Sequence, residues 1–81
     1  MKKYKKVIVV EAQQITDDDF GRGHPNPRHI KGVIYSPTNK TAWVGTNHGP
    51  EAAAIGDWII RKDGELSVCP RHEFEDEFEA I

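Results

Sequence analysis

The stretch 56–69, Gly-Asp-Trp-Ile-Ile-Arg-Lys-Asp-Gly-Glu-Leu-Ser-Val-Cys, decides the fold class of this chain. Its first half, Trp58–Arg61, is aromatic and β-branched at its start, a composition that favours a strand. Lys62-Asp63-Gly64 follows with the Asp-Gly pair that marks a hairpin turn, because these residues tolerate the left-handed backbone of such turns. Glu65–Cys69 then returns as the partner strand. The sequence therefore predicts an antiparallel hairpin in this region.

Short apolar runs separated by turn residues continue outward from this hairpin toward both ends of the chain. They predict further strands at 7–15, 30–36, 41–46, 51–55 and 78–81, a polar turn or one short helical turn at 16–20, and a single helical turn at 71–75. Three alanines at 51–55 favour a helix, but five residues between glycines are too few for a stable one. Six or seven short strands with frequent turns indicate a mainly β fold, a small antiparallel barrel-like or curled sheet with one short helical turn near the C-terminus.

Length and charge narrow the class of protein further. The chain has 81 residues, which suits one β-rich domain spanning 1–81. Its net charge of -2 argues against nucleic-acid binding, because phosphate recognition needs a surplus of basic side chains. The apolar run Val7–Val10 is shorter than the roughly 7–15 residues of a signal peptide core and the about 20 of a membrane span. We therefore expect a cytoplasmic protein with no membrane contact.

The two ends of the chain carry opposite charges. Residues 2–6 contain four lysines, and residues 73–79 contain five carboxylates. Opposite charges on neighbouring antiparallel strands stabilise their pairing by roughly 0.2–1 kcal/mol a pair. The pattern predicts that the first and last strands lie near each other.

The run Gly56-Asp57-Trp58-Ile59-Ile60-Arg61, followed by Gly64-Glu65, Cys69, Phe74 and Phe78-Glu79, resembles a family of small phage and prophage proteins with a Gly-Asp-aromatic (GDW/GDY) signature. The beginning of the chain, 5–13, is similar to the beginning of those proteins. The resemblance implies a phage origin and a shared fold rather than an activity. It leaves out the middle of the chain, where this protein has a loop rich in Gly, Pro and His.

A metal site and a thiol enzyme are alternatives that the residues suggest only weakly. His24, His29 and His48 lie on loops, and Cys69 and His72 are three residues apart, whereas a zinc site needs three or four such ligands to converge. Cys69 and His72 have no reason to meet in attack geometry across a proline. We expect neither a cofactor nor a metal, and no enzyme activity; the lone cysteine is expected to be a buried apolar side chain.

Loop cations and aromatic rings indicate binding of a ligand. We predict a ligand-binding set that could grip phosphate through arginine and stack a base on tryptophan: His24, Arg28, His29, Trp43, Asn47, His48 and Arg61. The alternative for a tryptophan in a strand of so small a domain is a place in the hydrophobic core rather than in a ligand site.

The sequence and the resemblance together predict a phage-encoded binding protein of the host cytoplasm that forms a homo-oligomer. It would counter a host process, as anti-defence proteins do, by sequestering a small anionic nucleotide-like ligand or by binding a host protein. The alternative is a structural or assembly accessory protein of a phage that has no ligand.

Overall fold

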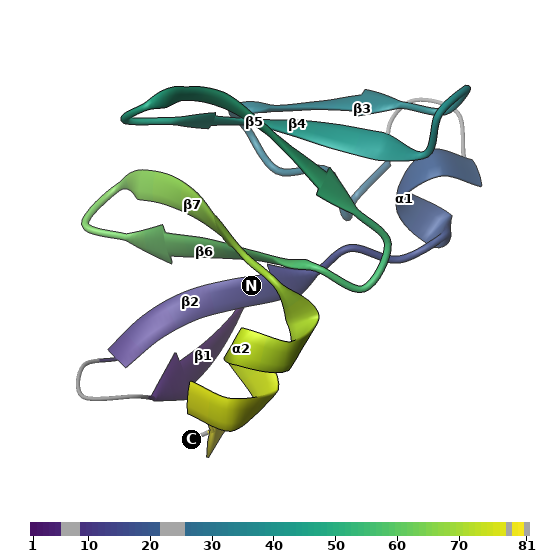
Figure 1. The fold of residues 1–81 in the computed structure, drawn as a ribbon. Helices are drawn as coiled ribbons and strands as arrows, with labels where there is room; N and C mark the ends of the chain where they lie inside the picture. The colour runs from purple at the N-terminus through teal and green to yellow at the C-terminus, as the bar shows by residue number, and fades with distance from the viewer. Residues whose placement is uncertain (6–8, 22–25, 78, 81) are drawn as a thin grey trace.

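The computed structural model describes residues 1–5, 9–21, 26–77 and 79–80, and these form a mainly β fold (Figure 1). The strands and helices follow one another as β1 (Lys2–Lys5), β2 (Val9–Gln14), α1 (Asp18–Gly21), β3 (Val33–Ser36), β4 (Thr41–Thr46), β5 (Gly49–Ala54), β6 (Trp58–Lys62), β7 (Glu65–Cys69), α2 (Arg71–Glu77) and β8 (Glu79–Ala80). Among the described residues no helix is long and apolar enough to cross a membrane.

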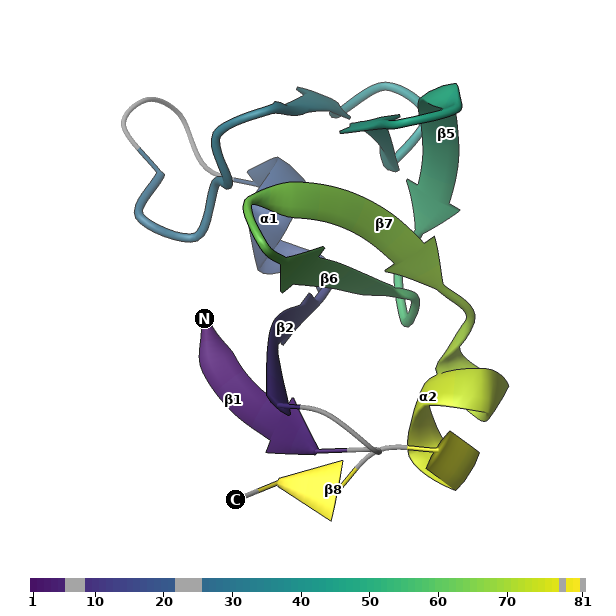
Figure 2. The same cartoon turned by 90° about the vertical axis from the view of Figure 1, so that its left-hand side faces the viewer.

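The strands form one curled sheet in the order β3-β4-β7-β6-β2-β1-β8, with β5 paired to the other side of β4. Neighbours are antiparallel except β4 and β7, which meet in parallel at the single pair Thr46 and Leu66. Figures 1 and 2 show β3, β4 and β5 as a layer over β6 and β7. The predicted fold class, a curled antiparallel sheet with a short C-terminal helix, is confirmed; within the described residues the two ends of the strand order do not pair, so the sheet is not closed.

The predicted hairpin is confirmed in register. Trp58 pairs with Cys69, and Lys62 pairs with Glu65 across a two-residue turn. Asp63 and Gly64 occupy this turn with φ angles of 52° and 81°. Positive φ at both central residues matches the right-handed twist of the flanking strands, which is why Asp-Gly favours this turn.

The predicted neighbourhood of the two ends is also confirmed, although the N-terminal strands differ from the prediction. The strand predicted at 7–15 is present as β2, with residues 7 and 8 outside the described ranges, and β1, which pairs with β2, lies at 2–5, where no strand was predicted. On its other side β1 pairs with β8, with Lys5 opposite Glu79. Of the five carboxylates at 73–79, only Glu79 therefore lies on the strand next to β1, and the other four belong to α2.

Strand β3 is shorter than the predicted 30–36. Residues 30–32 form a turn in which the Val33 amide donates to the Ile30 carbonyl at 3.2 Å. Gly32 has a φ angle of +94°, a conformation that side chains disfavour and that cannot continue a strand. The strand therefore begins only at Val33. The C-terminal helix α2 is longer than the single turn expected at 71–75 and extends to Glu77.

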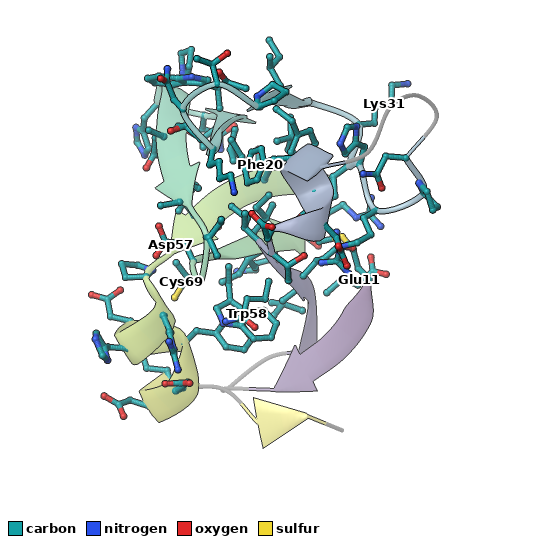
Figure 3. All side chains as sticks on the ribbon, turned by 90° about the vertical axis from the view of Figure 1, so that its right-hand side faces the viewer. Glu11, Phe20, Lys31, Asp57, Trp58 and Cys69 are labelled. Atoms are coloured by element: carbon teal, nitrogen blue, oxygen red, sulfur yellow. The ribbon has the colours of Figure 1, made fainter. Side chains whose placement is uncertain are left out.

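Two apolar clusters form the core. The first lies between the β3–β5 layer and β6, and includes Ile15, Phe20, Val44 and Ile59. The second lies between β2, β6 and α2, where Trp58 stacks on Phe74 with ring centroids 3.9 Å apart (Figure 3). Cys69 is buried in this second cluster, as the sequence predicts.

The Gly-Asp pair of the signature has a structural role in the turn before β6. Gly56 has a φ angle of +99°, which favours glycine there. The Asp57 side chain accepts the Ala54 amide at 3.0 Å, and the Asp57 amide donates to the Ala54 carbonyl at 3.0 Å. The Gly56 amide donates to the Ile15 carbonyl at 2.9 Å. These contacts hold the end of β5 against the end of β2 and set the start of β6.

Candidate functional site

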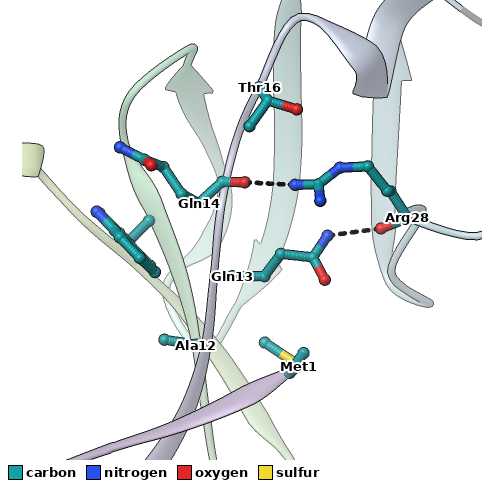
Figure 4. A pocket seen from close by; sticks show the side chains of 7 residues that line it. Met1, Ala12, Gln13, Gln14, Thr16 and Arg28 are labelled. Carbon is teal, nitrogen blue, oxygen red and sulfur yellow. Dashed lines mark hydrogen bonds between the residues drawn. The ribbon is translucent and has the colours of Figure 1, made fainter. Parts of the chain in front are cut away.

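Residues from β2, α1 and the following loop meet in a polar junction, which we call the Asp19–Arg28 junction. Asp19, whose side chain is 1% exposed, accepts the Thr16 amide at 2.8 Å and Arg28 Nε at 2.9 Å. Arg28 Nη2 donates to the Gln14 carbonyl at 2.9 Å, and Gln13 Nε2 donates to the Arg28 carbonyl at 2.7 Å (Figure 4). The aspartate caps the first turn of α1 in the manner of a capping box, and the arginine neutralises its buried charge.

Asn26 fixes the loop that carries Arg28. Its side-chain carbonyl accepts the Arg28 amide at 2.9 Å, and its side-chain amide donates to the Asp18 carbonyl at 3.0 Å. Asn26 is 7% exposed, so these two bonds satisfy a buried polar side chain. The loop is thereby joined to α1 by its own side chains.

His29 belongs to the same structural network. One of its ring nitrogens lies 2.8 Å from the Asp19 carbonyl, and its ring stacks on Tyr35 with centroids 4.0 Å apart. The Tyr35 hydroxyl accepts the Ile30 amide at 3.1 Å. Burial raises the pKa of the Tyr35 phenol above its ordinary 10.0, while the bond from Ile30 opposes this rise. The Tyr35 side chain therefore stays protonated and packs under the loop.

A hollow of about 400 Å³ lies beside the junction, lined by Met1, Ala12, Gln13, Gln14, Thr16, Arg28 and Trp58 (Figure 4). This size suits a small molecule. The Arg28 side chain is 37% exposed, so part of its guanidinium group can be reached from the hollow. Its positive charge is already opposed by Asp19, which weakens its attraction for an anion.

The other predicted polar residues lie elsewhere. Asn47 and His48 form the β4–β5 turn, where Asn47 Nδ2 donates to Glu65 Oε2 at 2.7 Å. Arg61 on β6 forms an ion pair with Glu11 on β2 at 3.2 Å. Figure 1 shows the β4–β5 turn at one end of the molecule and α1 at the other. The structure therefore does not gather the predicted ligand-binding residues into one site, and His24 lies outside the described residues.

Trp43 lies on a surface that the sequence did not reveal as a unit. We call this surface the outer face: it consists of the residues of β3, β4 and β5 that point away from β6 and β7, namely Ile34, Ser36, Thr41, Trp43, Gly45, Pro50, Ala52 and Ala54. Trp43 pairs with Ile34 on one side and with Ala52 on the other, so the three form one row across the layer. Trp43 is 45% exposed and Ile34 is 72% exposed.

All the side chains of the outer face are uncharged, and the large ones are apolar. Large apolar side chains gathered on an exposed surface mark a site of interaction more often than scattered ones do. Side chains alternate along a strand, so the sequence of β3 already predicts that Ile34 points to one side and Val33 and Tyr35 to the other. It does not predict which of the two sides meets the core. This depends on β6 and β7, which are distant in sequence.

Neither a metal site nor a Cys69–His72 catalytic pair is formed among the described residues. Cys69 is buried and its thiol donates to the Pro70 carbonyl at 3.6 Å, whereas His72 is exposed on α2. Over the ranges 1–5, 9–21, 26–77 and 79–80, the structure contains no group of three or more His, Cys, Asp or Glu residues arranged to hold a metal ion.

The chain matches no protein family model, no curated protein and no solved structure. The arrangement of its own residues is therefore the basis for assigning a function.

Proposed function

We propose that this chain is a non-catalytic binding protein that docks a protein partner through the outer face. In keeping with the phage resemblance, it would act in the host cytoplasm and counter a host process by this contact. The observation that carries the proposal is the exposed row of Ile34, Trp43 and Ala52 on an uncharged sheet surface.

A protein partner is favoured over a small anion because the predicted cations already have partners within the fold. Arg28 pairs with Asp19, and Arg61 pairs with Glu11. Recruiting either arginine to a phosphate would cost the existing contacts, and for Asp19 it would leave a buried charge uncompensated. Trp43, in contrast, has about half of its surface available for a partner, and tryptophan is among the residues that contribute most to protein interfaces.

Affinity capture tests this proposal. The wild-type chain, the double variant Ile34→Ser/Trp43→Ser and the control Ile55→Ser are immobilised and exposed to host-cell lysate. Ile55 is 46% exposed, like Trp43, but lies outside the outer face, so it controls for a general loss of apolar surface. We expect the wild type and the control to retain the same protein and the double variant to lose it. Equal retention by all three would place the docking site elsewhere.

The hollow beside Arg28 supports a second candidate function, binding of a small anionic nucleotide-like ligand. A nucleotide panel in a thermal-unfolding assay tests it, because a ligand at 100 times its Kd stabilises the folded state by about 2.7 kcal/mol. Arg28→Lys keeps the charge beside Asp19 but removes the two-pronged donor, and should reduce the stabilisation. The absence of stabilisation across the panel would dismiss this candidate and leave the docking proposal untouched.

A further inference from the structure

We propose that the hollow beside the Asp19–Arg28 junction binds an uncharged cyclic amide of the kind present in the nucleobases uracil and hypoxanthine, which carry a C=O and an N–H on adjacent ring atoms. This inference rests on the second candidate function, nucleotide binding, and states which part of the ligand is recognised. The observations that carry it are an uncovered edge of β2, a hydrogen-bond acceptor beside that edge, and an apolar wall without a free charge.

The hollow lies at the edge of β2 that β1 leaves uncovered. Within the described residues, β1 pairs with β2 only as far as Ala12, which lies opposite Lys2. The Ile15 amide donates to the Asp57 carbonyl at 2.8 Å, so Ile15 continues the pairing of β2 with β6. Successive residues of a strand direct their backbone groups to opposite edges, so those of Gln14 point to the other edge, where Gln14 lines the hollow. The Gln14 amide is therefore a donor that a ligand can reach.

The other backbone groups along this part of the chain are occupied, which favours a small ring over an extended peptide. The Gln14 carbonyl accepts Arg28 Nη2 at 2.9 Å. The Thr16 amide donates to Asp19 Oδ2 at 2.8 Å, and the Thr16 carbonyl accepts the Asp19 amide at 3.1 Å. A peptide that adds a strand to a sheet needs a row of amides and carbonyls, not a single amide.

Gln13 supplies a hydrogen-bond acceptor beside this donor. Its side chain donates from Nε2 to the Arg28 carbonyl at 2.7 Å. Because a carbonyl can only accept, this contact fixes the amide group and leaves Gln13 Oε1 without a donor among the residues that the structure describes. Figure 4 shows Gln13 and Arg28 on one side of β2 and the side chain of Gln14 on the other. A ligand with adjacent C=O and N–H groups can accept from the Gln14 amide and donate to Gln13 Oε1.

The side chains of the hollow offer no free charge for a phosphate or an ammonium group. Among the described side chains that line it, only Arg28 is charged, and its Nε already pairs with Asp19 at 2.9 Å. Apolar surface comes from Met1, Ala12 and Trp58. The volume of about 400 Å³ is within the range of small-molecule sites. An uncharged base, with apolar faces and a polar edge, matches this lining.

Titration of the full chain with nucleosides, followed by protein NMR, tests the inference. We expect uridine to bind with a Kd of roughly 0.1–1 mM, as is typical of an uncharged ligand of its size. In 3-methyluridine a methyl group replaces the hydrogen of the ring N–H, so Gln13 Oε1 loses its donor and binding should weaken at least about tenfold. Uridine 5′-monophosphate should bind within about threefold of uridine, because the charge of Arg28 is already opposed by Asp19.

A variant of Gln13 provides the matching change in the protein. Gln13→Met keeps the length of the side chain but removes the amide oxygen, and should weaken uridine binding at least about tenfold. His48 is exposed on the β4–β5 turn, away from the hollow, so His48→Ala serves as the control and should bind uridine as the wild type does. Circular dichroism checks that both variants are folded. The comparison of uridine with 3-methyluridine uses the wild type alone and decides the question if Gln13→Met does not fold.

The outcomes separate this inference from the candidate function on which it rests. Weaker binding of 3-methyluridine to the wild type, and of uridine to Gln13→Met, supports recognition of the cyclic amide. Binding of the monophosphate without binding of uridine, or equal binding of uridine and 3-methyluridine, overturns that recognition and leaves nucleotide binding in place. If neither nucleosides nor nucleotides bind, both fail.

Discussion

The side chains of the Asp19–Arg28 junction have partners within the fold, whereas the large side chains of the outer face of β3–β5 are exposed to solvent. At the junction every charged or hydrogen-bonding side chain that we describe has a partner in the same chain: Asp19 accepts from Thr16 and Arg28, and Arg28 donates to Gln14. On the outer face, large apolar side chains such as Trp43 remain exposed. The charged residues that could bind a ligand, such as Arg28, form contacts within the fold, whereas the large apolar residues Ile34 and Trp43 are exposed to solvent.

This difference shows that residue type alone does not identify a binding site. An arginine in a Gly/Pro-rich loop is suited to bind an anion, but here it neutralises a buried aspartate and holds α1 in place. A tryptophan in a strand of a small domain is expected in the core, and Trp58 follows this expectation while Trp43 does not. Whether a side chain has a partner inside the fold is the better guide to its function.

The largest effect is expected at the junction. Asp19→Ala removes the partner of Arg28 and of the Thr16 amide, and should lower the free energy of unfolding by about 3 kcal/mol. The value is at the lower end for a buried ion pair because Arg28 is 37% exposed. Urea unfolding measures it. The exposed neighbour Asp18→Ala serves as the control and should change stability by no more than about 0.5 kcal/mol. Equal effects of the two substitutions would show that the junction does not stabilise the fold.

A smaller effect, and one that depends on pH, is expected at Tyr35. Because its pKa is raised in the folded protein, Tyr35 binds its proton more tightly there than in the unfolded chain. This contribution is fully present below the ordinary pKa of 10.0 and is lost as the pH rises through the raised folded value. Stability curves from about pH 9 to about pH 11.5 should therefore fall more steeply for the wild type than for Tyr35→Phe.

The Tyr35→Phe variant also loses the bond from the Ile30 amide, so at neutral pH it should be less stable by about 1 kcal/mol. Other groups that titrate at high pH are common to both proteins, and the difference between their curves isolates Tyr35. Parallel curves would contradict the assignment of Tyr35 as a half-buried, protonated phenol.

The smallest effect on stability is expected on the outer face. Trp43→Ser removes only cross-strand contacts with Ile34 and Ala52, and should lower the free energy of unfolding by about 1 kcal/mol or less at concentrations where the protein is monomeric. The adjacent residue Val44 points inward and is 0% exposed, so Val44→Ala should cost about 2 kcal/mol. A larger loss for Trp43→Ser than for Val44→Ala would place Trp43 in the core and remove the basis of the outer face.

Local sequence patterns were sufficient for most of the fold. The hairpin of β6 and β7 follows from Asp63-Gly64, and β4 lies at the predicted 41–46. Strand β5 begins two residues before the predicted 51–55, and the pairing of β1 with β8 agrees with the expected proximity of the two ends. The predictions failed at boundaries that depend on single glycine conformations, as at Gly32 before β3. They also missed β1, because no strand was predicted at 2–5.

The sequence by itself determined most of the segments that are strands, β1 excepted, because period-two alternation and turn chemistry act between residues that are close in the chain. Only the tertiary structure decided which side of β3, β4 and β5 is buried, because β6 and β7 cover one side and leave Ile34 and Trp43 on the other. It also decided that Arg28 meets Asp19 rather than a ligand. Burial and ion pairing join residues that are distant in the sequence, and alternation specifies two sides of a strand without specifying which of them meets the core.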